Sequence, residues 1–310
     1  MPVILTHSQG RTQMFQPLLE AGLRGTMHRF VKPVLSRAFP LSVQRRYTRE
    51  AYRTSYPPKD VSFAWEDLGD VPVLRASPED RSGGTVLYFH GGGYVMGSAD
   101  THRGIAGHLA KFSGCDVLIP DYRLAPEHPF PAAPDDAEAV YLALINQGVS
   151  PGSIAVAGDS AGGGLSVVLA MRLRDHGHPL PSSVTCFSPW TDLSEKDLYT
   201  PECEPVLHAA WTFKAAKMYA NGVPLTHPLV SPVYGDLSGL PPLLIQVGSQ
   251  EVLLNDARRL AEAAKQEHVE TTLEIYNNLW HVFQVHAAQL DRARDALAVA
   301  GRHIRHHLQA

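Results

Sequence analysis

A serine lies in a glycine-rich turn between an apolar run and a segment with helical spacing. Gly158-Asp-Ser-Ala-Gly162 fits the pattern G-x-S-x-G, and the run Ile154–Ala157 directly precedes it. In this setting a strand ends in a turn so sharp that only small residues fit on both sides of the serine. The hydroxyl of Ser160 then stands at a helix N-terminus, where backbone N–H groups and the helix dipole favour negative charge. The pattern therefore predicts that Ser160 is a nucleophile for acyl transfer.

Phosphate binding is the alternative chemistry for a glycine-rich turn between a strand and a helix. Turns of that kind follow the spacing G-x-G-x-x-G or contain G-K-[ST]. The segment Gly158–Gly163 does not match the first spacing, and the sequence contains no G-K-[ST]. The sequence therefore favours a catalytic serine over a phosphate site.

Three consecutive glycines follow another apolar run. The run Thr85–Phe89 leads into His-Gly-Gly-Gly-Tyr, a motif that ends at Tyr94. Glycines at a strand end cost chain entropy, and they are useful where the backbone must approach a ligand closely. We predict that the N–H groups of Gly92, Gly93 and Ala161 stabilise the oxyanion of a tetrahedral intermediate. Tyr94 adjoins these glycines and is a predicted substrate contact.

Chain order selects one base among sixteen histidines. Where a G-x-S-x-G turn carries the nucleophile, the catalytic residues follow the order serine, acid, histidine, so the base must come well after Ser160. His281 follows the apolar run Thr272–Tyr276 and precedes the last predicted helix, a position from which it can reach over a sheet to the serine. His90 precedes the serine, and we expect it to hold the glycine loop by hydrogen bonds.

Two carboxylates follow the apolar run Leu243–Val247 and compete for the role of the acid. Glu251 lies nearer to the end of this run, where the loop would face the site. Asp256 stands at the start of the next predicted helix, where an acidic residue is useful as a cap or as a partner of the helix dipole. We favour Glu251 as the residue that orients His281, and Asp256 remains the alternative.

From about residue 71 onward, short apolar runs alternate with segments of helical spacing. Several runs are apolar throughout, which is typical of strands that are buried on both faces of a parallel sheet. Such alternation predicts an α/β fold with right-handed crossovers. The predicted strands are Val71–Ala76, Thr85–Phe89, Asp116–Ile119, Ile154–Ala157, Val184–Phe187, Leu243–Val247 and Thr272–Tyr276.

Two regions fall outside this alternation. Residues 1–55 show helical patterns without strand-like runs, and residues 190 to about 225 carry large apolar side chains without a clear strand. We predict that residues 1–55 form N-terminal cap helices, and that residues 56–310 form the catalytic domain with a cap insertion at about 190–225. Trp211 in this insertion is a predicted substrate contact, although apolar residues of a cap more often serve packing alone.

Composition and charge limit the class of protein. Apolar residues make up 44% of the 310 residues and charged residues 19%, which is usual for a globular protein. The net charge of −4 argues against binding to nucleic acid or to an anionic membrane. The three cysteines show no metal-binding spacing, so we expect neither a metal site nor a disulfide scaffold. The sequence shows neither a signal-peptide core nor a run of about 18 apolar residues, so we predict a cytoplasmic protein.

Five segments together resemble the hormone-sensitive-lipase-like family of bacterial esterases. They are His90–Tyr94, Asp121–Pro131, Gly158–Gly163, Ser188–Asp192 and His281–Phe283, and their order and spacing match as well as their letters. The resemblance implies an α/β-hydrolase fold, with a mostly parallel eight-stranded sheet flanked by helices and a helical cap. It also implies that the protein needs no metal and no organic cofactor.

The same resemblance implies the activity. It assigns the roles of nucleophile, acid and base to Ser160, Glu251 and His281, in a carboxylesterase that cleaves short- to medium-chain esters through an acyl-enzyme. Many members carry the acid in an Asp-Pro-Leu sequence, whereas Glu251-Val-Leu253 stands at that place here.

Other reactions and partners are compatible with the same motifs. Hydrolysis of an amide, a lactone or a carbonate is the alternative on the same site. Binding proteins of this fold that have lost catalysis lack the histidine, so the presence of His281 argues against that class. We expect a small-molecule ester as the partner. Because sheet edges of this fold can pair between subunits, a homodimer is the fold-level expectation.

Overall fold

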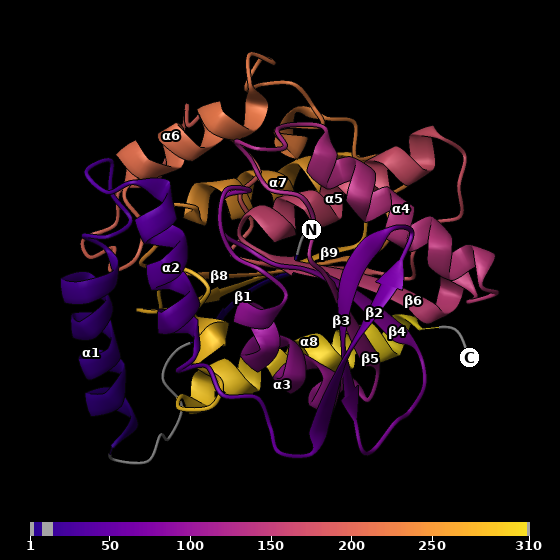
Figure 1. The fold of residues 1–310 in the computed structure, drawn as a ribbon, viewed down its shortest axis with the longest axis horizontal. Coiled ribbons are helices and arrows are strands. Elements are labelled where there is room, and N and C mark those ends of the chain that lie inside the picture. Colours follow the sequence, from indigo (N-terminus) through magenta and orange to yellow (C-terminus); the bar gives the residue numbers. More distant parts are fainter. Residues whose placement is uncertain (1–2, 8–14, 309–310) are drawn as a thin grey trace.

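The computed structural model describes residues 3–7 and 15–308, in which helices cover both faces of a sheet (Figure 1). Within these residues the strand order is β1-β9-β8-β7-β6-β4-β5-β3-β2. Neighbouring strands are parallel, except that β3 is antiparallel to both β2 and β5. The strands are β1 (Val3–His7), β2 (Val61–Leu68), β3 (Val71–Pro78), β4 (Thr85–Phe89), β5 (Asp116–Pro120), β6 (Ile154–Asp159), β7 (Val184–Phe187), β8 (Leu243–Gly248) and β9 (Thr271–Tyr276). The predicted mostly parallel sheet is confirmed.

Helices α4, α5 and α7 lie on one face of the sheet, and α3 and α8 lie on the other (Figure 1). The helices are α1 (Gln16–Thr26), α2 (Leu41–Tyr52), α3 (Arg103–Ser113), α4 (Ala132–Asn146), α5 (Ala161–Asp175), α6 (Ala209–Ala220), α7 (Leu254–Gln266) and α8 (Asp291–His307). Shorter turns are a π-helical turn at Met27–Val31 and 3₁₀ turns at Asp100–His102, Pro151–Ser153, Pro232–Tyr234 and Phe283–His286. Every residue of β6, β7 and β8 is buried, which explains why apolar residues predominate in these strands. Among the described residues, no helix has the length and apolar character that a membrane span requires.

The first strand lies in a region for which the sequence predicted helices alone. β1 pairs with β9 at one edge of the sheet, from Val3 beside Thr272 to His7 beside Tyr276. It adds a ninth strand to the eight strands β2–β9. The prediction that residues 1–55 contain no strand is therefore wrong. A run of three apolar residues is too short to indicate a strand, and the pairing with the distant β9 is what makes it one.

β2, at the opposite edge, gave no apolar run in the sequence. Only its end residues, Val61 and Leu68, are buried, because a strand at a sheet edge leaves most of its side chains in contact with water. Its connection to β3 is a tight turn in which Gly69 and Asp70 have φ angles of 58° and 63°. Two successive left-handed residues are typical of the turns that join antiparallel strands.

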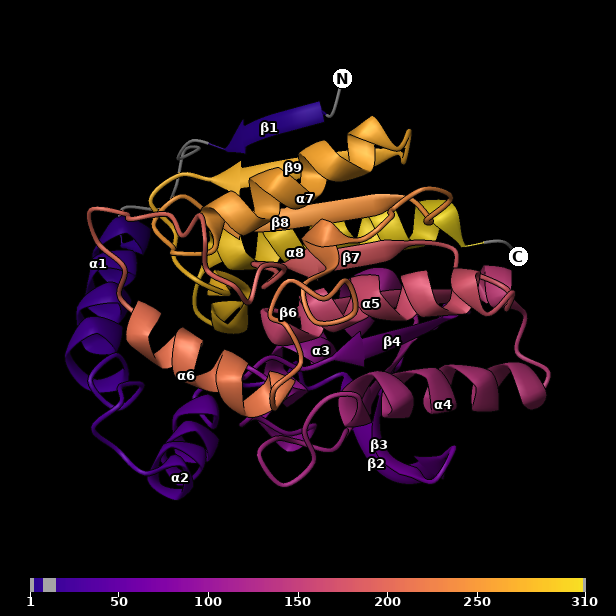
Figure 2. The same ribbon diagram turned by 90° about the horizontal axis from the view of Figure 1, so that it is seen from above.

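The two segments predicted to form a cap contact each other. Helices α1, α2 and α6 lie beyond the carboxyl ends of the strands (Figure 2). Gln44 on α2 donates from its amide nitrogen to the carbonyl groups of Val34 (3.0 Å) and Ser36 (2.7 Å), and its own carbonyl accepts from Nε1 of Trp211 on α6 at 2.9 Å. The buried side chain of Gln44 thus joins both segments. Their division from the catalytic domain stays a prediction.

Replacing Gln44 by leucine is expected to destabilise the protein. The substitution removes the partners of two carbonyl groups and of the Trp211 N–H, and a buried polar group left unpaired costs about 1–3 kcal/mol. We expect the urea midpoint of unfolding to fall for Gln44→Leu and to stay unchanged for Ser42→Ala, an exposed residue of the same helix. Equal midpoints for the two variants would contradict the role of Gln44.

Candidate active site

Ser160 stands in the turn between β6 and α5 with backbone angles that are unusual for a residue with a side chain. Its φ is 53° and its ψ is −119°. A Cβ atom at Gly158 would lie 2.3 Å from the carbonyl oxygen of Gly162, and one at Gly162 would lie 2.0 Å from the carbonyl oxygen of Phe89. Any side chain at these positions would therefore clash with backbone atoms. This explains the two glycines of the G-x-S-x-G pattern.

His281 lies in the loop after β9 and meets the serine. Its Nε2 atom is 3.0 Å from the Oγ atom of Ser160. This distance is within the range in which a base takes a proton from a hydroxyl group. Ser160 and His281 are 121 positions apart in sequence, and they meet because both follow carboxyl ends of parallel strands.

Glu251 is fully buried on the other side of the imidazole. Its Oε1 atom lies 3.5 Å from Nδ1 of His281, a distance for an ion pair rather than a short hydrogen bond. Its Oε2 atom accepts from Oγ of Ser188 at 2.8 Å and from the N–H of Gly248 at 3.2 Å. Ser188 in turn accepts from the N–H of Val282 at 3.0 Å, so the loops that carry Glu251 and His281 are linked.

The electrostatic surroundings make His281 a stronger base. Burial alone would lower the pKa of its imidazole, but the contact with Glu251 and the negative charges of Glu251, Glu204 and Asp159 raise it. A raised pKa means that the site stabilises the charged imidazolium. This is the form that a histidine adopts after it has taken a proton from a serine.

Asp256, the other carboxylate that the sequence left open, has different partners. Its Oδ2 atom accepts from the N–H groups of Thr191 (2.8 Å) and Asp192 (2.7 Å), in the loop after β7. Burial raises the pKa of Asp256 to about 7. The structure therefore brings Glu251, and not Asp256, to His281, while Asp256 holds a neighbouring loop in place.

The three glycines after β4 lie beside Ser160. Gly92 and Gly93 have φ angles of 117° and 63°, and both line the same small cavity as Ser160 and His281. Among the described residues, the structure records no acceptor for the N–H groups of Gly92 and Gly93. His90 is buried below them, and its Nδ1 atom lies 2.8 Å from the carbonyl oxygen of Gly91.

The two predicted substrate contacts have different outcomes. Trp211 lines the cavity of Ser160, close to Gly93. Tyr94 does not line it: the phenol is 1% exposed and stacks on Tyr219 with a centroid distance of 3.8 Å. Tyr94 is adjacent to the glycines in sequence, but its side chain belongs to the core beneath the cap. The structure thus corrects the prediction for Tyr94.

Two cavities meet at His281. The one that contains Ser160 has a volume of about 80 Å³. A larger cavity of about 360 Å³ lies between the N-terminal cap helices and the segment 281–289, and apolar side chains such as Leu23, Met27 and Phe30 dominate its wall. Because His281 and Val282 line both cavities, a ligand can extend from the serine into the larger one.

Glu204, a buried residue of the predicted cap insertion, was not singled out by the sequence. Its Oε1 atom accepts from the N–H groups of Val206 (2.7 Å) and Leu207 (3.0 Å). Its Oε2 atom accepts from the N–H of Val252 at 3.0 Å, next to Glu251. Val206 and Leu207 line the cavity of Ser160, so Glu204 joins a wall of that cavity to the loop that carries Glu251. No local pattern could reveal it, because its partners are backbone N–H groups, one of them 48 residues away.

Comparison with known proteins assigns the fold to a family. A family model described as alpha/beta hydrolase fold matches residues 86–285, and the chain belongs to that family. A crystal structure of an esterase from the bacterial hormone-sensitive lipase family is 36% identical, with a TM-score of 0.88 over 94% of this chain and 98% of that chain. The structure of EstE5 soaked with p-nitrophenyl butyrate is 35% identical, with a TM-score of 0.88 over 94% and 99% of the two chains.

Proteins with similar sequences indicate the type of reaction. An acetyl-hydrolase of Streptomyces hygroscopicus is 43% identical over 252 residues, which are 80% of this chain and 83% of the relative. The putative acetyl-hydrolase LipR of Mycobacterium tuberculosis is 35% identical over 289 residues, 90% of this chain and 94% of the relative. The chain is a carboxylic ester hydrolase of the bacterial hormone-sensitive lipase family. The predicted family, fold class and type of enzyme are confirmed.

Removing the charge of Glu251 is expected to reduce activity far more than removing that of Asp256. Glu251→Gln leaves the imidazolium without its buried counter-charge, and the corresponding change in a serine triad lowers kcat by about 10⁴-fold. Asp256→Asn keeps an oxygen that can accept from Thr191 and Asp192, so we expect less than about a tenfold loss. Hydrolysis of p-nitrophenyl butyrate measures both. Equal activities of the two variants would leave the choice of Glu251 without support.

Glu204→Gln is expected to shift the pH profile of kcat/KM. The charge of Glu204 raises the pKa of His281, and the neutral form of the imidazole is the base. Without this charge the pKa of His281 falls, so the acid limb of the profile moves to lower pH by up to about one unit. Glu202→Gln, an exposed residue two positions earlier, is the control. Unchanged profiles in both variants would show that Glu204 has no electrostatic effect on the base.

Proposed function

We propose that Ser160, His281 and Glu251 are the nucleophile, base and acid of this carboxylesterase. The single observation that carries the proposal is that His281 contacts both other residues. Its Nε2 atom lies 3.0 Å from Oγ of Ser160, and its Nδ1 atom lies 3.5 Å from Oε1 of Glu251. His281 takes the proton as the serine oxygen attacks the ester carbonyl. The alcohol leaves with that proton, and water then releases the acid from the acyl-enzyme by the same route.

The N–H groups of Gly92, Gly93 and Ala161 stabilise the negative oxygen of the tetrahedral intermediate in this proposal. Ala161 is the first residue of α5, and N–H groups in the first turn of a helix have no partner within the helix. Gly92 and Gly93 lie at the same cavity as the serine. Donors that are already in place need no reorganisation when charge develops, and each contributes about 10²–10³-fold to the rate in comparable enzymes.

The substrates are esters of short- to medium-chain acids. The cavity at Ser160 is small, which supports a short acyl group, while the apolar cavity beside the cap helices has room for a larger part of the ester. Two further observations support short acyl chains. The relatives from Streptomyces and Mycobacterium are named acetyl-hydrolases, and crystals of a similar esterase were soaked with p-nitrophenyl butyrate.

The partner is a small-molecule ester, and the cellular location is the cytoplasm. The three cysteines support this location because Cys115, Cys186 and Cys203 are all free thiols. A homodimer would form through the outermost strands of the sheet, which are β1 and β2 within the described residues.

Ser160→Ala tests the proposal. We expect hydrolysis of p-nitrophenyl butyrate to fall by more than about 10³-fold, because the substitution removes the oxygen that forms the acyl-enzyme. Labelling by a fluorophosphonate probe is expected to disappear with it. Ser150→Ala, which removes an exposed hydroxyl, should keep both properties. Wild-type activity in Ser160→Ala would overturn the assignment.

A further inference from the structure

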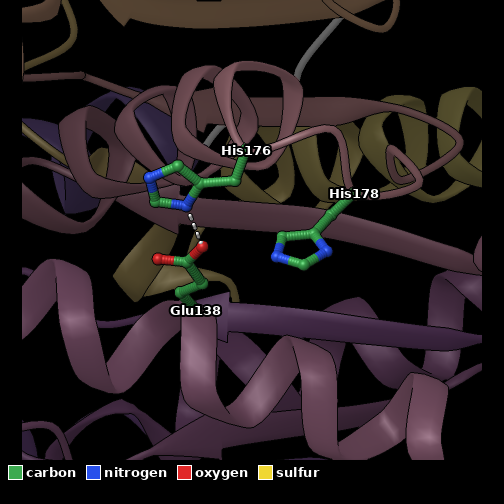
Figure 3. Close-up of side chains that lie close together, drawn as sticks. All are labelled: Glu138, His176 and His178. Carbon is green, nitrogen blue, oxygen red and sulfur yellow. Dashed lines mark hydrogen bonds and ion pairs between the residues drawn. The ribbon is translucent and has the colours of Figure 1, made fainter.

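A second group of polar side chains lies at the far end of α5 from Ser160. Glu138 on α4, His176 at the end of α5 and His178 each offer a ligand atom, and these atoms all lie within 4.8 Å of one another. Both imidazole rings stand beside the carboxylate of Glu138 (Figure 3). α5 has 15 residues, so at about 1.5 Å per residue this group is roughly 22 Å away from the serine.

The backbone holds the two histidines in place. Gly177 between them has a φ of 71°, and the N–H of His178 donates to the carbonyl of Leu173 at 2.8 Å, in the manner of a helix end with a left-handed glycine. On the other side, the hydroxyl of Tyr141 on α4 donates to the carbonyl of Pro179 at 3.0 Å. The turn is therefore fixed both to α5 and to α4, and the cluster needs little reorganisation to bind a ligand.

Two neighbours hold the carboxylate of Glu138 in place. Arg172 lies 2.6 Å from Oε2, while Nδ1 of His176 lies 2.6 Å from Oε1. Arg172 also contacts Asp135 at 2.8 Å, which offsets its positive charge. One carboxylate oxygen is thus held by a neighbour and the other faces the histidines, an arrangement that is common behind metal ligands.

We propose that Glu138, His176 and His178 bind a divalent transition-metal ion, and that zinc fits best. Two imidazoles with one carboxylate are a usual donor set for zinc, whereas magnesium and calcium prefer oxygen ligands alone. Bond lengths of about 2.0–2.2 Å place the ligand atoms of a tetrahedral site about 3.3 Å apart. The ligand atoms lie within 4.8 Å of one another, so they must come closer by up to about 1.5 Å, through rotation of the imidazole side chains. Water completes the fourth position, since the His176 side chain is 51% exposed.

The ion would fasten α4 to the turn after α5. It replaces the direct contact between Nδ1 of His176 and Oε1 of Glu138, which lie 2.6 Å apart. Because the cluster lies at the opposite end of α5, the ion does not touch the ester or the reacting atoms. Its effect is on the stability of the folded chain, because a ligand that binds only the folded state raises its Tm.

Zinc titration of the full chain tests the site. After treatment with EDTA and its removal, we expect calorimetry at pH 7.5 to show one saturable zinc per wild-type chain and a Tm that rises with zinc. His178→Gln and Glu138→Gln should each weaken this binding by at least tenfold. The matched control is His268→Asn: it removes an exposed histidine outside the cluster and keeps a residue that tolerates the left-handed backbone at this position. The control should bind zinc as the wild type does.

Circular dichroism and the Tm must show that His178→Gln and Glu138→Gln fold without zinc. If one of the two variants fails to fold, the other still tests the site. Absence of saturable binding in the wild type would overturn the proposal. Equal binding by the wild type and by a folded His178→Gln or Glu138→Gln would also overturn it, because the zinc would then lie elsewhere, for example at the neighbouring rings of His303, His306 and His307.

Discussion

The close approach of α5 to the end of β4 is the constraint on which the catalytic geometry depends. α5 begins so near the sheet that Gly162 packs against the carbonyl oxygen of Phe89, where no Cβ atom would fit. β6 lies beside β4 with Phe89 opposite Gly158, so the glycine loop that follows Phe89 is held next to the nucleophile turn. The left-handed backbone of Ser160 costs about 1–3 kcal/mol, and the rigid central strands on both sides maintain it.

Buried charges fix the loops that this contact brings together. Asp159 is 1% exposed and accepts from the N–H of Gly91 at 3.0 Å and from the hydroxyl of Tyr88 at 2.7 Å, which ties the glycine loop to the nucleophile turn. Burial lowers the pKa of two histidines, but their charged neighbours give them opposite net shifts. His281 faces carboxylates and its pKa is raised, whereas burial, together with the neighbouring His102, lowers the pKa of His90 to about 3. One imidazole is therefore suited to carry a proton, and the other stays neutral as a structural group.

The sequence predicts the turn between β6 and α5 and the glycine loop after β4 because both leave a local pattern. In both segments, steric limits act between residues a few positions apart. The acid could only be narrowed to two carboxylates: the partners of Asp256 are backbone groups 64 and 65 residues away, which no spacing reveals. Adjacency in sequence was misleading for Tyr94, whose ring packs on Tyr219. β1 was missed for a related reason, since it depends on pairing with a strand at the other end of the chain.

The turn of Ser160 and the proposed metal cluster lie at opposite ends of α5, and their contributions to the free energy of the protein are separate. Twelve of the fifteen residues of α5 are buried, so the helix is packed along its length and does not bend easily. The geometry at Ser160 is set by the glycine contact and by the register of β4 and β6 at one end of α5. The cluster at the other end joins α4 to a turn and shares no side chain with the catalytic site. Sites more than about 10 Å apart that have no common partners contribute almost independently. An ion at Glu138 would therefore add to the free energy of unfolding and leave the contact between Ser160 and His281 unchanged.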